Sequence, residues 1–265
     1  MNIFITGASS GLGEALALLY AERGAVLGLL ARRRDKLETL AYNLAEKTTV
    51  RIYQGDVCDR DAVQYAADDF MASFGVPDIV IANAGVSYGT VTGGSGDGDL
   101  PVFREVINTN LLGMVYTFHS FVDTMRQARA GTLVGVASIA GYRGLPGSGG
   151  YSASKAAAIA YLESLRVDLQ DSGVSVVTLC PGFVDTPMTR YNPYPMPFLI
   201  TAQKAAQLMI RAIDRKKRCY LFPWQMMLIG KMLPMIPDSV FDAFFRFFLK
   251  RVSTKPRKDL PHGDE

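Results

Sequence analysis

The chain of 265 residues has few of the side chains from which metal sites and disulfide frameworks are built. It contains two histidines, His119 and His262, and three widely separated cysteines, Cys58, Cys180 and Cys219. Two histidines and scattered cysteines match no metal-ligand pattern, so we expect no metal ion. An odd number of distant cysteines predicts free, mostly buried thiols in a reducing compartment.

Net charge and long apolar runs are also scarce. The formal net charge is +3, and most of the excess lies at residues 246–258, which argues against nucleic acid as a partner. The apolar stretch 221–229 is far shorter than a membrane span. Residues 2–5 predict a strand rather than a signal peptide, so we expect a cytoplasmic protein.

Short apolar runs recur along the chain, at residues 3–5, 26–30, 50–53, 79–82, 132–136 and 174–179. Segments with helical spacing of leucines lie between them. Continuous apolar strands are buried on both faces, as in a parallel sheet covered by helices. The pattern therefore predicts a doubly wound α/β fold, whose ligands bind at the carboxyl ends of the strands.

No linker divides this pattern, so we predict one catalytic domain over residues 1–253. Within it, residues 187–252 are expected to hold a substrate loop and an apolar C-terminal helical region. Residues 254–265 are basic and polar and predict a disordered tail. The glycine-rich residues 93–98 predict a flexible surface loop near the rim of the site.

The first strand is followed by a glycine loop, Thr-Gly-Ala-Ser-Ser-Gly-Leu-Gly, at residues 6–13. Glycines here allow a tight turn, close approach of the backbone to a pyrophosphate and close helix packing. The following helix N-terminus presents N–H groups to the anion. We therefore predict a dinucleotide site, although the glycines alone would also serve a turn. Its expected residues are Gly7, Ser9, Ser10, Gly11, Leu12 and Gly13.

The second strand lacks the acidic residue that bonds the ribose of NAD at its end. It ends instead in Arg32, Arg33 and Arg34. A guanidinium forks onto a phosphate through two hydrogen bonds, so Arg32 and Arg33 suit the 2′-phosphate of NADP. Ser9 or Ser10 can add a hydroxyl. We predict NADP(H) in preference to NAD(H); the alternative is a solvated, basic helix start, which we assign to Arg34.

Tyr151 and Lys155 are four residues apart and share one helix face if this segment is helical. An ammonium close to a phenol favours the phenolate and lowers its pKa toward working pH. Such a phenol serves as a general acid or base. Taken alone, the pair would more often be a surface tyrosine beside a solvated lysine.

The order of these motifs resembles the short-chain dehydrogenase/reductase family, in its subgroup of about 250 residues built as one Rossmann domain. The resemblance covers roughly residues 1–190 and implies a seven-stranded, mostly parallel sheet with helices on both faces. Asp56 and Val57 resemble the pair that meets the adenine ring. Asn83, Ala84 and Gly85 are similar to the family's Asn-Asn-Ala-Gly, in which Ala82 replaces the first Asn.

The resemblance also implies the roles of the remaining site residues. The segment that holds the nicotinamide carboxamide corresponds to residues 181–186, with Pro181, Gly182, Val184 and Thr186 expected at the cofactor. The implied catalytic residues are Ser138, Tyr151, Lys155 and Asn110. Tyr151 exchanges the proton, Ser138 supports the alkoxide and Asn110 holds a water. Tyr151 and Lys155 are also expected to bind the cofactor, Lys155 through the nicotinamide ribose. The local alternatives are that Ser138 caps a strand end and that Asn110 satisfies backbone groups inside its helix.

These expectations predict an NADP(H)-dependent carbonyl reductase or alcohol dehydrogenase that acts on a small molecule. The proline-punctuated, apolar residues 188–198 favour an apolar ketone, aldehyde or secondary alcohol. The alternative is a non-catalytic NADP(H)-binding redox sensor or scaffold, peripheral to a membrane. By analogy with the family we expect a homodimer or homotetramer.

The C-terminal residues 240–252 place apolar side chains at helical spacing beside three cations, Arg246, Lys250 and Arg251. Such a face packs on a partner subunit, closes over the substrate pocket or lies in a membrane interface. We favour packing, because apolar helical faces are more often core, and leave the other two open. The apolar members are Val240, Phe241, Phe244, Phe245, Phe248 and Val252.

Overall fold

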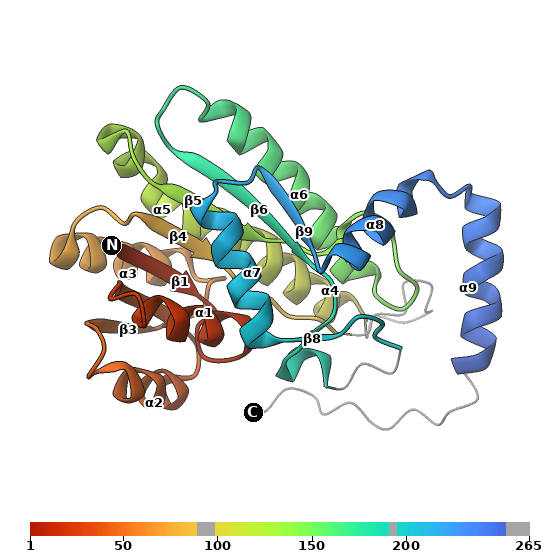
Figure 1. The fold of residues 1–265 in the computed structure, drawn as a ribbon, viewed down its shortest axis with the longest axis horizontal. Coiled ribbons are helices and arrows are strands. Elements are labelled where there is room, and N and C mark those ends of the chain that lie inside the picture. Colours follow the sequence, from red (N-terminus) through yellow and green to blue (C-terminus); the bar gives the residue numbers. More distant parts are fainter. Residues whose placement is uncertain (89–98, 191–194, 253–265) are drawn as a thin grey trace.

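The computed structural model describes residues 1–88, 99–190 and 195–252, and places a seven-stranded parallel sheet at the centre of the molecule (Figure 1). The strand order is β3-β2-β1-β4-β5-β6-β9. The predicted doubly wound sheet is therefore confirmed. The strands are β1 (Asn2–Thr6), β2 (Val26–Ala31), β3 (Val50–Gln54), β4 (Ile79–Ala82), β5 (Thr132–Val136), β6 (Ser175–Pro181) and β9 (Cys219–Phe222).

The direction of winding reverses between β1 and β4, which are hydrogen-bonded neighbours. In their register, Thr6 at the end of β1 lies opposite Ala82 at the end of β4 and Leu30 near the end of β2. The loops that follow these strands therefore meet at one edge of the sheet. In this fold that edge is where ligands bind.

Helices cover both faces of the sheet and bury separate apolar cores. One core joins the sheet to α1 (Gly11–Ala21), α2 (Arg34–Leu44) and α7 (Ala202–Asp214). The opposite core joins it to α3 (Arg60–Phe74), α5 (Gly113–Ala128) and α6 (Gly149–Asp168), with Phe4 at its centre. Burial on both faces is the reason that central strands such as β2 and β4 are continuously apolar, whereas the edge strand β3 exposes Arg51.

Before α5 the chain forms α4 (Asp99–Ile107) and then a π-helical turn, Asn108–Leu112. After β6 it forms a small second sheet from β7 (Val184–Asp185) and β8 (Ile200–Thr201). A 3-10 turn, Pro187–Thr189, lies between β7 and β8. These elements surround the carboxyl edge of the main sheet.

The apolar stretch 221–229 belongs to two elements. Its first two residues end β9, which pairs with β6 at the edge of the sheet. After Pro223, residues 224–229 lie in α8 (Trp224–Met232). A 3-10 turn, Leu233–Met235, leads to α9 (Asp238–Val252), which stands apart from the sheet (Figure 1). No helix in the described part of the chain is long and apolar enough to cross a membrane.

The remaining expectations concern the glycine-rich loop, the C-terminal tail, the domain boundary and the thiols. The glycine-rich residues 93–98 and the tail 254–265 lie outside the described residues, and the single domain over residues 1–253 stays a prediction. The three cysteines are free, but only Cys180 is buried; Cys58 is half-buried and Cys219 is exposed. The expectation of mostly buried thiols was therefore wrong, because Cys219 begins an edge strand.

Candidate active site

The glycine loop adopts the backbone that its sequence predicts. Gly7 and Gly11 have φ angles of 68° and 60°, in the left-handed region that side chains disfavour. A Cβ on Gly13 would collide with the carbonyl oxygen of Gly7. Asn83 fixes the loop from β4, since its Nδ2 donates to the carbonyl oxygens of Thr6 and Gly7, each at 3.1 Å. Asn83 therefore shapes the loop.

Arg33 is the arginine that reaches the glycine loop. Its Nη2 donates to Ser9 Oγ at 3.1 Å and to Ser10 Oγ at 2.7 Å. Arg32 is exposed and turns toward Tyr88 and Cys58, where its charge lowers the pKa of both groups against the larger effect of burial. The sequence placed Arg32 first, but only Arg33 gathers with the two serines at the start of α1.

The proposed proton-transfer group combines the end of β5 with α6. Tyr151 is half-buried, and its phenol forms a hydrogen bond with Ser138. Ser138 Oγ also accepts from the backbone N–H of Ala140 at 3.1 Å and caps a short 3-10 helix, Ile139–Gly141. Ser138 is therefore a cap, but of a helix rather than of a strand end. The bond from Ala140 uses a lone pair of Oγ and does not engage the hydroxyl proton of Ser138, which can donate.

Lys155 is buried, with 4% of its surface exposed, and points at the sheet. Its Nζ donates to the carbonyl oxygen of Val136 at 2.8 Å and lies 5.7 Å from the ring centre of Tyr151. The contact with Val136 was not predicted. Its acceptor is a backbone carbonyl, which every residue has, so the amino-acid sequence does not indicate it. It aims the ammonium at the end of β5.

Burial controls the pKa values of this pair. It raises the pKa of Tyr151, and the hydrogen bond with Ser138 lowers that pKa only in part. Burial also lowers the pKa of Lys155 to about 8. The prediction that Lys155 lowers the pKa of Tyr151 was therefore wrong for this structure, because desolvation dominates and the ammonium is turned to Val136. Tyr151 keeps its proton at neutral pH, as a general acid requires.

Asn110 lies fully buried in the π-helical turn between α4 and α5. Its Nδ2 donates to the carbonyl oxygen of Val86 and to Ser154 Oγ, both at 3.0 Å, and its Oδ1 accepts from the N–H of Val86 at 2.8 Å. Asn110 thus satisfies backbone groups. They belong to Val86, in the loop after β4, and not to the helix of Asn110 as the local alternative required. Single π-helical turns are frequent at functional sites.

Gly85 marks the point where the asparagine and the lysine approach each other. A Cβ built on Gly85 would lie 3.2 Å from Asn110 Oδ1 and 3.6 Å from Lys155 Nζ. Any larger residue would press on both polar groups. Ala84, the neighbour of Gly85, packs against the glycine loop. A side chain at Gly7 is excluded, since its Cβ would lie 2.6 Å from Ala84 Cα.

The segment that follows β6 closes the site from the other side. Pro181 ends β6, and the N–H of Gly182 donates to the carbonyl oxygen of Phe222 at 2.8 Å. Val184 is buried in β7. Thr186 reaches the glycine loop, because a Cβ on Gly11 would lie 3.2 Å from its Cγ2. The predicted carboxamide segment is thus next to the predicted phosphate loop.

The predicted adenine pair follows β3. Asp56 Oδ1 accepts from the N–H of Cys58 at 2.9 Å and so shapes the turn. Val57 is buried and packs against Gly113, where a Cβ would lie 2.6 Å from Val57 Cγ2. Leu12 is partly buried against the core that includes α1. Val57 and Leu12 therefore have packing roles in addition to any contact with a cofactor.

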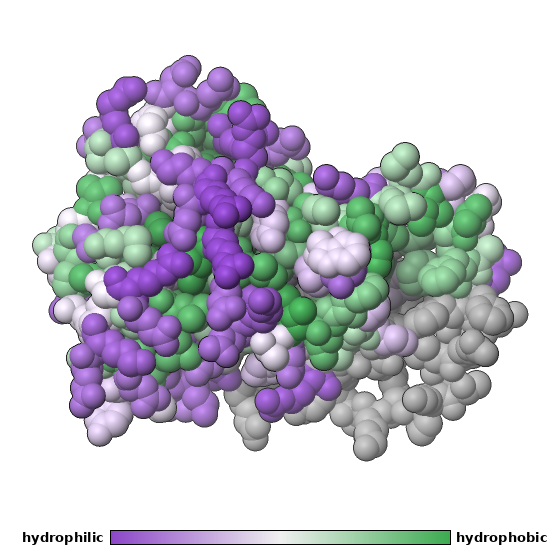
Figure 2. Space-filling view, in the orientation of Figure 1, coloured by the Kyte–Doolittle hydropathy of each residue, from purple (hydrophilic) through white to green (hydrophobic). Residues whose placement is uncertain are grey.

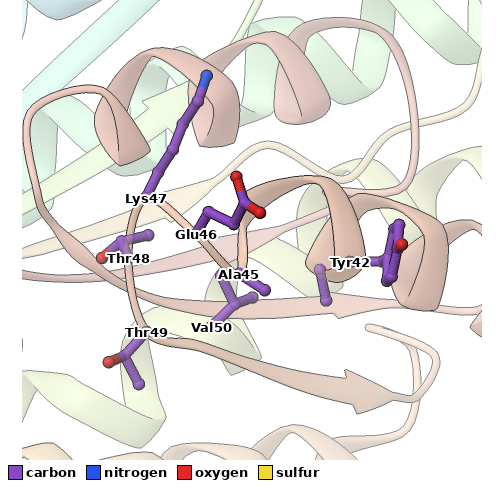
Figure 3. A pocket seen from close by; sticks show the side chains of 8 residues that line it. Tyr42, Ala45, Glu46, Lys47, Thr48, Thr49 and Val50 are labelled. Carbon is purple, nitrogen blue, oxygen red and sulfur yellow. The ribbon is translucent and has the colours of Figure 1, made fainter.

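A surface hollow of about 620 Å³ lies elsewhere, where α2 turns into β3 (Figure 3). This turn is at the amino end of β3, whereas ligands in this fold bind at the carboxyl ends. Tyr42 and Lys47 in its rim are exposed, and none of the predicted site residues lines it. We assign it no function. Its lining residues are Ala41, Tyr42, Ala45, Glu46, Lys47, Thr48, Thr49 and Val50.

A Rossmann-type sheet with a glycine loop at its switch point and a tyrosine–lysine pair beside it defines an NAD(P)-dependent oxidoreductase. The family model described as short chain dehydrogenase matches residues 1–194, and the chain belongs to this family. The predicted family and the predicted class of enzyme, an NAD(P)-dependent dehydrogenase or reductase, are thus confirmed.

Three similar proteins support this membership. An uncharacterized oxidoreductase of Myxococcus xanthus is 40% identical over 245 residues, which are 91% of this chain and 95% of the relative. An uncharacterized oxidoreductase of Staphylococcus aureus is 36% identical over 191 residues, 71% of this chain and 80% of the relative. The structure of an alcohol dehydrogenase from Thermococcus sibiricus, complexed with 5-hydroxy-NADP, superimposes with a TM-score of 0.74 at 29% identity. It covers 83% of this chain and 95% of that one.

Proposed function

We propose that the chain is an NADP(H)-dependent carbonyl reductase or alcohol dehydrogenase for an apolar ketone, aldehyde or secondary alcohol. The observation that carries this proposal is the meeting of Ser138, Tyr151 and Lys155 at the end of β5. One phenol that holds its proton, one hydroxyl able to donate and one buried ammonium form an acid site for a carbonyl oxygen.

The residues at the switch point fit a dinucleotide phosphate. Gly7, Gly11 and Gly13 leave a cradle that Cβ atoms would fill or distort. Arg33 adds a guanidinium beside the two serine hydroxyls at the start of α1, a donor set suited to the 2′-phosphate of NADP. The NADP analogue held by the Thermococcus sibiricus enzyme favours the same cofactor.

When bound, NADPH supplies the hydride that reduces the substrate carbon. In the proposed mechanism, Tyr151 delivers its phenolic proton to the carbonyl oxygen as negative charge develops there. Ser138 donates a hydrogen bond to the same oxygen with its hydroxyl proton, which the bond accepted from Ala140 does not engage. In the oxidative direction Tyr151 takes the proton of the alcohol.

Lys155 and Asn110 are proposed to help return a proton to Tyr151 after it has protonated the substrate. Lys155 holds a positive charge near the phenol and supplies donors for the nicotinamide ribose. Asn110 is proposed to hold a water that returns protons toward Lys155. Both N–H donors of Asn110 are occupied, so this water must use the remaining acceptor site of Oδ1 or the main chain.

The substrate class follows from the segment after β7. Met188, Phe198 and Leu199 each expose more than two fifths of their surface. Residues 191–194, which lie between them, are outside the described residues. Exposed apolar side chains close to an active site favour apolar substrates.

The first test is NADPH oxidation by the purified chain with a panel of aldehydes, ketones, quinones and steroids. We expect turnover to increase with the apolar character of the carbonyl compound. A preference for hydrophilic ketones would contradict the substrate class. Tight NADPH binding without turnover on any compound would favour the alternative, a non-catalytic redox sensor or scaffold.

The pKa of Lys155 predicts a pH dependence. Lys155 is charged below about pH 8 and loses its proton as the pH rises through that value. We therefore expect kcat/KM for NADPH, at saturating ketone, to be constant below about pH 8 and to fall up to about tenfold per pH unit above it. Steady-state rates between about pH 6 and pH 10 measure this profile.

The Lys155→Arg variant is the control, because arginine stays charged throughout this range. Its lower activity should lack the fall near pH 8. A wild-type profile that is flat to about pH 10 would show that Lys155 does not titrate there.

The proposal also covers the oligomeric state and the cellular location of the enzyme. By analogy with the family we propose a homodimer or homotetramer, which sedimentation equilibrium would establish. We also propose a cytoplasmic location, on the basis of the free thiols.

A further inference from the structure

The C-terminal elements carry a patch of exposed apolar side chains, which we call the α8–α9 surface. Figure 2 shows hydrophobic residues gathered over α8 and α9, on the side of the molecule away from α2 and α3. Trp224 and Met232 of α8 are 65% and 62% exposed, and Met235 in the following turn is 80% exposed. The favoured interpretation of residues 240–252, that their apolar face packs on a partner subunit, stays a prediction. The members of the surface are Trp224, Leu228, Ile229, Met232, Met235, Val240 and Phe244.

Arg143 holds this surface in a defined position. Its Nη1 donates to the carbonyl oxygens of Leu233, at 2.9 Å, and Ile236, and its Nη2 donates to Asp238 Oδ1 at 2.6 Å. Its guanidinium also lies 4.2 Å from the ring centre of Phe241. Arg143 itself belongs to the loop before α6 and is mostly buried. Arg143 therefore joins the elements that carry the exposed side chains to the loop between Ser138 and Tyr151.

Cations accompany the apolar side chains. Lys231 of α8 and Arg246 of α9 are exposed on the same elements. In the sequence, residues 243–258 contain six cations, Arg246, Lys250, Arg251, Lys255, Arg257 and Lys258, and no acidic residue. Apolar side chains flanked by lysine and arginine are typical of helices that lie in the interface of an anionic membrane. A tryptophan at the border of such a surface fits the headgroup level.

We propose that the α8–α9 surface docks the protein on the surface of an anionic lipid bilayer. The exposed apolar side chains enter the boundary between headgroups and acyl chains, and the cations meet the lipid phosphates. A second copy of the chain is a poorer occupant. A symmetric dimer through this surface would gather the six cations of residues 243–258 from both copies near one interface, and this excess of positive charge opposes association.

The test is co-sedimentation of the full chain with vesicles of phosphatidylcholine alone and of phosphatidylcholine with about one third phosphatidylglycerol. We expect binding to the anionic vesicles at low salt, weaker binding at about 0.5 M salt, and little binding to phosphatidylcholine alone. The Met232→Glu/Met235→Glu variant should bind anionic vesicles about tenfold or more weakly, because two apolar side chains are lost and two anions added.

A matched variant, Tyr42→Glu/Tyr65→Glu, adds two carboxylates at exposed apolar positions on α2 and α3, 83% and 70% exposed. It should bind as the wild type does. Absence of binding at low salt, or equal loss in both variants, would overturn the proposal. So would a Met232→Glu/Met235→Glu protein that binds vesicles normally but dissociates in sedimentation equilibrium, since the surface would then join subunits. Retained secondary structure in both variants excludes misfolding, and the outcome is independent of whether NADPH is oxidised.

Discussion

Replacing Tyr151 with Phe is expected to lower kcat for carbonyl reduction by about 10³-fold. The change removes one oxygen and with it the phenolic proton, which burial keeps in place at neutral pH. Ser138 would still donate to the carbonyl oxygen, so a small residual rate is expected. Single-turnover oxidation of NADPH with the best substrate of the panel measures this loss directly.

The control for this variant is Tyr161→Phe, which makes the same chemical change further along α6 on a partly buried tyrosine. Its kcat should stay within about twofold of the wild type. NADPH affinity should change by less than about threefold in Tyr151→Phe, because the proposed phosphate contacts lie at the start of α1 and not at Tyr151. Near-normal turnover of Tyr151→Phe would refute the proposed mechanism.

Replacing Arg33 with Ala is expected to raise the Kd for NADPH by about 10- to 100-fold. Charge-assisted hydrogen bonds are worth roughly 1.5–3 kcal/mol, and about 1.4 kcal/mol is tenfold in affinity. The Kd for NADH should change little, because NADH has no 2′-phosphate. Fluorescence titration of both nucleotides gives the two constants.

Neighbouring arginines supply the comparison. Arg34→Ala should leave both affinities unchanged, since Arg34 is exposed and pairs with Glu38 at 2.7 Å. Arg32→Ala should have a smaller effect than Arg33→Ala, because Arg32 turns toward Tyr88. Equal dissociation constants of the wild type for NADPH and NADH, or a larger effect at Arg32, would contradict this assignment.

Several features of the fold could be predicted because they depend on local pattern. Six of the seven strands of the main sheet follow from continuous apolar runs, since a strand covered on both faces has no polar side to interrupt it. The conformations of Gly7 and Gly11 follow from the position of glycines between a strand and a helix. The seventh strand was expected from the family resemblance but not located, because β9 begins with an exposed cysteine and a half-buried tyrosine.

The residues of the candidate site stay predictions, and the structure shows contacts among them that differ from those expected. The spacing of Tyr151 and Lys155 places them on one face of α6 whatever surrounds the helix. Their pKa values depend on the surroundings, and desolvation there has the opposite effect on Tyr151 to the one expected from the lysine alone. Asn110 was likewise identified, but its bonds to Val86 follow from the docking of the loop after β4.

The sequence by itself determined the family, the doubly wound sheet and the residues that gather at its switch point, because these depend on periodicity, glycine positions and fixed spacings. Only the tertiary structure decided that Arg33 rather than Arg32 reaches Ser9 and Ser10. It also decided that apolar residues of α8 and the following turn are exposed. Consecutive side chains at a strand end diverge, and exposure depends on which distant elements pack nearby. Neither property is contained in a local pattern.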